Sequence, residues 1–112
     1  VTPGDEGAGR GLISATARAG LAAMQKKDYA GAIARLEEAL PRVTDAGRRN
    51  VLFNLACGYA LSGRKPEALD RLEKAVAEGF GPREAIEGDE DLASLRGEAR
   101  FAEIVAKAKP RS

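Results

Sequence analysis

Few side chains of this 112-residue chain could do chemistry, and none has a neighbour in sequence that would activate it. Glu37 and Glu38 are a carboxylate pair of the kind that can supply an acid and a base. Adjacent residues of a helix point about 100° apart, so these two carboxylates would not converge on one substrate. The chain has no His, which removes the most common acid–base residue and metal ligand. We therefore expect no catalytic residues and a protein that is not an enzyme.

Cys57 and the acidic run Glu87–Asp91 are the remaining candidates. A reactive thiol needs a cationic neighbour or a helix start, whereas Cys57 is expected in mid-helix as a packed or groove-lining residue. The acidic run lacks the alternating oxygen ligands and the distal Glu of a calcium loop, and fits the first turn of a helix better. A single Cys allows no internal disulfide and no Cys-based zinc site. We therefore predict no metal and no cofactor.

Charge and hydropathy exclude two further classes of partner. The 18 basic and 17 acidic residues leave a net charge of +1, and the basic pairs are interspersed with acids, so we expect no nucleic-acid binding. No apolar run approaches the roughly 20 residues of a membrane span, so we expect no membrane insertion. Because the chain begins at Val1, we expect an excised or processed chain. The compartment stays open between the cytoplasm and, if a signal was removed upstream, the periplasm.

The elements that position these residues are predicted to be helices. The chain has 22 Ala and 11 Leu but only 12 Val, Ile and Thr together, which favours an all-α fold. Residues 1–10 are rich in Gly and show no apolar periodicity, so we expect a disordered lead-in there. Apolar spacing, capping residues and Gly or Pro punctuation predict helices at Ser14–Met24, from Asp28 to near Pro41, from Thr44 or Asp45 to Gly63, and from Pro66 to Gly79.

An internal repeat organises these helices. The segment Ala32–Leu40 aligns with Ala68–Val76 at an offset of 36 residues, and five of the nine positions are identical. A period of this size, filled by two helices, is typical of a helical-hairpin array.

The repeat resembles the tetratricopeptide repeat (TPR) family, in which small residues allow the two helices of each hairpin to approach closely. The residues that carry the resemblance are Gly20, Ala32, Leu36 and Ala39 in the first copy, and Ala56, Tyr59, Ala68, Leu72 and Ala75 in the second. The C-terminal part resembles a segment that closes such arrays in bacterial proteins, through Gly79-Phe80, the acidic run before Leu92-Ala-Ser-Leu95-Arg96, and a helix led by Phe101.

The resemblance implies a right-handed array of two helical hairpins with a helical C-terminal cap. The hairpins would occupy residues 11–44 and 45–79, and the cap residues 80–109. Two hairpins leave an apolar face open, and five residues of the cap could cover it: Leu92, Leu95, Phe101, Ile104 and Val105.

In the TPR family, the first helix of each hairpin lines a concave groove. The groove residues implied here are Arg18, Leu21, Met24, Gln25, Asn50, Phe53, Asn54, Cys57 and Leu61. Asn54 matches a position at which family members bind a peptide backbone. We expect a protein–protein interaction module that binds a peptide or helix of a partner. The alternative to an open groove is that the chain itself or a second copy covers this face, so a homodimer is compatible with the sequence. The alternative function is a structural capping or dimerisation module of a larger enzyme.

Overall fold

The structure is a computed structural model that describes residues 15–110, and within this range every regular element is a helix. Of the first helix, the structure describes residues 15–25. This helix is followed by α2 (Tyr29–Ala39), the 3-10 helix η1 (Leu40–Arg42), α3 (Asp45–Leu61), α4 (Lys65–Ala77), α5 (Arg83–Glu87), the 3-10 helix η2 (Glu90–Leu95) and α6 (Ala99–Lys107). The predicted all-α fold is confirmed. The expected lead-in at 1–10 and the start of the hairpin expected at 11–44 lie outside the described residues.

The helices end where capping and turn residues predicted. The Asp28 carboxylate accepts a hydrogen bond from the backbone N–H of Gly31 at 3.0 Å and so caps α2. Pro41 lies in η1, which closes the first hairpin. Gly63 has a φ of +81°, a left-handed conformation that favours glycine, and Pro66 follows in the first turn of α4.

Small residues allow the first helix and α2 to pack closely. A methyl group added to Gly20 would lie 2.8 Å from Leu36 Cγ, so the first helix needs glycine to approach α2 at this distance. Gly58 of α3 plays a similar part, because a methyl group there would lie 3.2 Å from Ile33 Cγ1 and 3.5 Å from Met24 Sδ. Helix α3 therefore packs against both the first helix and α2.

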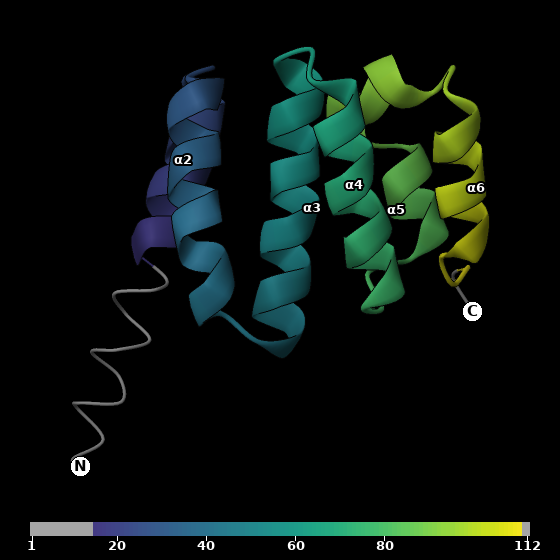
Figure 1. Cartoon of the computed structure of the whole chain (residues 1–112), viewed down its shortest axis with the longest axis horizontal. Coiled ribbons are helices and arrows are strands. Elements are labelled where there is room, and N and C mark those ends of the chain that lie inside the picture. Colours follow the sequence, from purple (N-terminus) through teal and green to yellow (C-terminus); the bar gives the residue numbers. More distant parts are fainter. Residues whose placement is uncertain (1–14, 111–112) are drawn as a thin grey trace.

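The C-terminal segment continues the same core. The helices from α2 to α6 stand side by side in a row (Figure 1), with η2 packed on α3 and α4, and α6 packed on α4 and α5. The five apolar residues expected to cover the second hairpin are all buried in one cluster with Leu69, Leu72 and Val76. A buried side chain that the sequence analysis did not single out, Ile86 of α5, joins them. The segment is thus part of the fold and not a tail.

The acidic run begins a 3-10 helix. The Asp89 carboxylate accepts a hydrogen bond from the backbone N–H of Asp91 at 2.9 Å, which caps η2. The expectation of a helix start is therefore confirmed, in the tighter 3-10 form. The short helix α5 before it was not predicted, since five residues are too few to show a helical period.

Candidate binding groove

An open hollow lies between the first helix and α3. Its volume is about 180 Å³, and its lining comprises Ala17, Leu21, Leu36, Val43, Gly47, Asn50, Val51 and Asn54. Leu21 is 38% exposed and is the one large apolar side chain classed as exposed among residues 15–110. An apolar side chain placed in the hollow would remove Leu21 from water, which is favourable because the walls around Leu21 are largely apolar too.

Two asparagines give this hollow a polar edge. The Asn54 side-chain N–H donates to the backbone carbonyl of Asn50, one turn earlier, at 2.9 Å. An asparagine amide has a second N–H and a carbonyl oxygen, and neither is used in this bond. The Asn54 amide can therefore offer a donor and an acceptor side by side, which matches the needs of a peptide backbone.

The other half of the expected groove is covered by the chain itself. The Phe53 ring stacks on the Phe80 ring, with centroids 4.2 Å apart and an angle of 12° between the planes. Cys57 is only 2% exposed, and the Ser94 hydroxyl of η2 donates to the backbone carbonyl of Ala60 at 3.4 Å. This face is therefore open around Leu21, Asn50 and Asn54, and it is covered by the chain itself around Phe53 and Cys57.

The structure therefore separates the nine predicted groove residues. Leu21, Asn50 and Asn54 meet in the hollow. Met24 and Phe53 are partly buried and pack against the core, and Leu61 is half-buried near the end of α3. Arg18 and Gln25 are exposed on the first helix and do not line the hollow.

The predicted groove set omitted five of the eight residues that line the hollow: Ala17, Leu36, Val43, Gly47 and Val51. Leu36 and Val51 have the helical spacing of core residues, and this spacing does not distinguish a core residue from one at the edge of a hollow. Sequence reasoning also missed the Phe53–Phe80 stack. Phe80 lies outside any helix, so no periodicity indicates which way its ring points.

Cys57 has two acidic neighbours that the sequence does not place beside it. Its sulfur and one carboxylate oxygen each of Asp89 and Asp91 all lie within 4.8 Å of one another. Burial and these carboxylates raise the pKa of the Cys57 thiol far above its usual value, and burial and Asp89 raise the pKa of Asp91. The thiol is therefore protonated and a poor nucleophile, and Asp89 is already engaged as the cap of η2.

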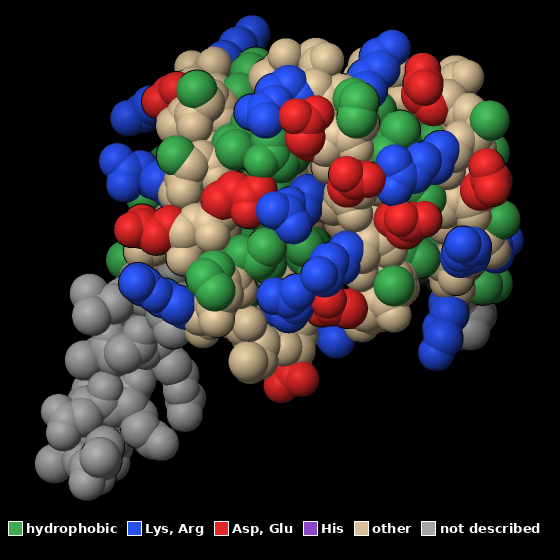
Figure 2. Space-filling model, viewed as in Figure 1, with side chains coloured by type: hydrophobic (Ala, Val, Ile, Leu, Met, Phe, Trp, Pro, Cys, Tyr) green, Lys and Arg blue, Asp and Glu red, His purple; other side chains and the backbone are tan. Residues whose placement is uncertain are grey.

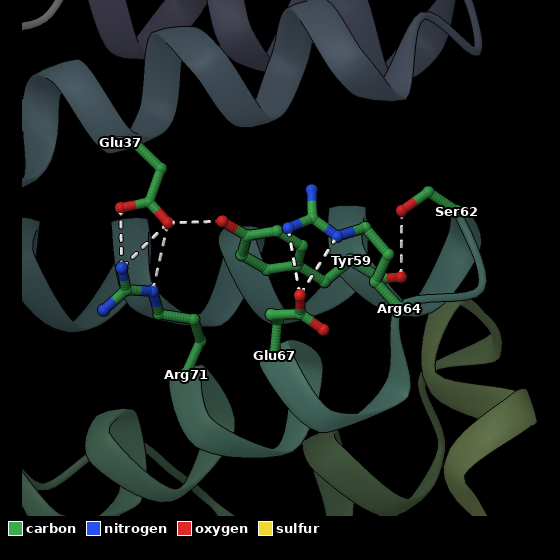
Figure 3. A network of polar contacts seen from close by, with 6 residues as sticks. All are labelled: Glu37, Tyr59, Ser62, Arg64, Glu67 and Arg71. Carbon is green, nitrogen blue, oxygen red and sulfur yellow. Dashed lines mark hydrogen bonds and ion pairs between the residues drawn. The ribbon is translucent and has the colours of Figure 1, made fainter.

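A second polar cluster joins α2, α3 and α4 (Figure 3). The Tyr59 hydroxyl donates to Glu37 Oε2 at 2.6 Å, and the Arg71 guanidinium holds the same carboxylate with two nitrogens at 2.7 to 3.2 Å. The Arg64 guanidinium lies over the Tyr59 ring, 4.7 Å from its centroid, and donates to Glu67. Each of these groups is engaged by another, so the cluster binds the helices together and leaves no free acid–base pair within it.

The surface carries both charges in close alternation. On the face shown in Figure 2, Lys and Arg side chains lie beside Asp and Glu side chains, with hydrophobic side chains between them. No helix in the described range is long and apolar enough to cross a membrane.

Comparison with known protein families, curated proteins and solved structures gives no match for this chain.

Proposed function

We propose that this protein is a TPR-like interaction module that binds an apolar peptide or helix of a protein partner in the open half of its groove. The support for a TPR-like array is the 36-residue repeat together with the close approach of helices at Gly20 and Gly58. The observation that carries the binding function is the hollow, which exposed Leu21 lines together with Asn50 and Asn54.

A binding role fits the chemistry of the groove better than catalysis does. The Cys57 thiol is buried and its raised pKa keeps it protonated, so it cannot act as a nucleophile near neutral pH. The Tyr59 hydroxyl is held by Glu37, which Arg71 neutralises. The groups left to meet a ligand are apolar side chains and two amides, which recognise a peptide without reacting with it.

The length of the bound segment follows from the covered half of the groove. Phe80 occupies the place on Phe53 that a longer ligand would need. We therefore expect a short contact, in which one apolar side chain enters the hollow and the flanking backbone reaches the amide of Asn54.

Selection from a library of random linear peptides displayed on phage tests this function. The intact protein should enrich peptides that share one large apolar residue. In titrations, Asn54→Ala should weaken the selected peptide by about 1–2 kcal/mol through lost backbone hydrogen bonds, and Leu21→Ser should weaken it further.

Lys74→Ala provides the matched control, because Lys74 is exposed on α4 and does not line the hollow. It should bind as the unaltered protein does. Peptides that bind all four proteins equally, or no enrichment at all, would contradict the groove assignment.

A further inference from the structure

Arginine side chains connect the successive outer helices of this protein. Arg71 of α4 reaches back to Glu37 of α2, with a shortest distance of 2.7 Å. Arg100 of α6 reaches back in the same way to Asp70 and Glu73 of α4, at 2.7 and 3.0 Å. The same kind of contact thus occurs twice along the row, each time between one outer helix and the next.

Arg35 occupies in the first repeat the position that Arg71 occupies in the second. Glu37, two residues later, points toward α4, and residues two apart on a helix point about 200° apart. Arg35 therefore points away from the rest of the row. It is exposed, and no carboxylate of residues 15–110 holds it in an ion pair.

The surface around Arg35 differs from the equivalent surface of α4. Gly31, Ala34, Arg35 and Glu38 share one side of α2 and line an open hollow of about 440 Å³. In the second repeat, the residues aligned with Gly31, Ala34 and Glu38 are Glu67, Asp70 and Lys74. The first repeat thus has Gly and Ala where the second repeat has Glu and Asp, and it has Glu where the second repeat has Lys.

We propose that this side of α2 is a docking surface for a second copy of the chain, packed antiparallel to it about a two-fold axis. Such a surface must complement itself, since each protomer presents the same residues. Arg35 and the partner's Glu38 would form two equivalent ion pairs, and Gly31 and Ala34 would let the two helices approach closely. The net charge of +1 opposes this association very little.

The dimer should be weak. A contact confined to one helix face buries less than the roughly 1,200 Å² of a stable interface, so we expect a dissociation constant of about 0.1 mM. The proposal is independent of the peptide groove, because the residues that line the two hollows are different.

Sedimentation equilibrium of the intact chain from about 0.02 to 1 mM tests this proposal. The unaltered protein should show a monomer–dimer equilibrium. Arg35→Glu and Glu38→Arg should each raise the dissociation constant at least about tenfold, because each places like charges opposite one another. Lys74→Glu, on the corresponding side of α4, should leave it unchanged.

An equimolar mixture of Arg35→Glu and Glu38→Arg makes the test specific for a two-fold contact. The acidic face of one variant then meets the basic face of the other, so the mixture should regain association at the level of the unaltered protein. Circular dichroism melting of each variant verifies its fold. A chain that stays monomeric up to 1 mM, single variants that associate normally, or a mixture that stays monomeric would each overturn the proposal.

Discussion

Tyr59 is held at the junction of three helices, and its hydroxyl should make stability depend on alkaline pH. Burial and the hydrogen bond to Glu37 raise the pKa of Tyr59 in the folded protein above its ordinary value. As the pH rises through that ordinary value, the unfolded chain loses its proton before the folded chain does, which favours unfolding. The stabilisation is therefore complete below about pH 10 and is lost above it.

Removing the hydroxyl should remove this dependence. Tyr59→Phe should be less stable than the unaltered protein by about 1 kcal/mol at neutral pH, because Glu37 loses one hydrogen bond. Between about pH 8 and pH 12, this difference in unfolding free energy should at first stay constant and then close as the pH rises above about 10. Urea denaturation of both proteins across this range measures it, and a gap that stays constant would contradict the role given to the hydroxyl.

The Cys57 thiol should be inert in the folded protein. It is 2% exposed, and burial with Asp89 and Asp91 nearby raises its pKa, so little thiolate is present and little reagent can reach it. Ellman's reagent should react with it at least about 100-fold more slowly in the native protein than in guanidinium chloride. Equal reaction rates in the two conditions would show that η2 does not shield the Cys57 thiol from the reagent.

At the scale of elements, Arg83 joins the start of α5 to the end of α6. Its guanidinium donates to the backbone carbonyls of Val105, Ala106 and Ala108 at 3.0 to 3.2 Å, and its backbone N–H donates to the carbonyl of Lys109 at 2.8 Å. The carbonyls at the end of a helix lack partners within the helix, so one planar side chain satisfies several of them.

Arg83→Lys tests this contact, because lysine keeps the charge but cannot reach several carbonyls with a rigid fork. The variant should lose about 1–3 kcal/mol in urea denaturation. Amide exchange should rise first at the end of α6. Lys107→Arg serves as the control, since Lys107 is exposed on the same helix. If Arg83→Lys matches the unaltered protein in both measurements, the contact does not stabilise α6.

Sequence predicts the long elements of this fold better than its contacts across elements. Asp28, Gly63 and Pro66 mark helix boundaries through local chemistry, so the ends of α2, α3 and α4 could be placed from the chain alone. The stack of Phe80 on Phe53 joins a coil residue to a helix residue 27 positions earlier (80 − 53), and no local rule specifies it. For this reason, the sequence left two alternatives for this face, an open groove and a surface covered by the chain itself.

At the scale of the whole molecule, the C-terminal segment covers the apolar side of α4. Leu92, Leu95 and Ile104 are almost fully buried, and they share a cluster with Leu69, Leu72 and Val76 of α4. A large side chain contributes about 1.5–3 kcal/mol on full burial, whereas the whole fold is stabilised by only about 5–15 kcal/mol. The burial of these side chains therefore makes the segment from Phe80 onward a large contributor to the stability of the fold.

Truncation at Gly79 should accordingly abolish cooperative unfolding, because α4 would expose its apolar side to water and the shortened chain would become molten or aggregate. Phe101→Ala in the intact chain should cost about 3–5 kcal/mol through the cavity it leaves among buried neighbours. Ala102→Ser, at an exposed position of the same helix, should melt close to the unaltered protein. Circular dichroism melting compares all four chains. A cooperative transition of residues 1–79 near the temperature of the intact protein would mean that each hairpin is stable without the cap, and that the row of helices in Figure 1 is not one cooperative unit.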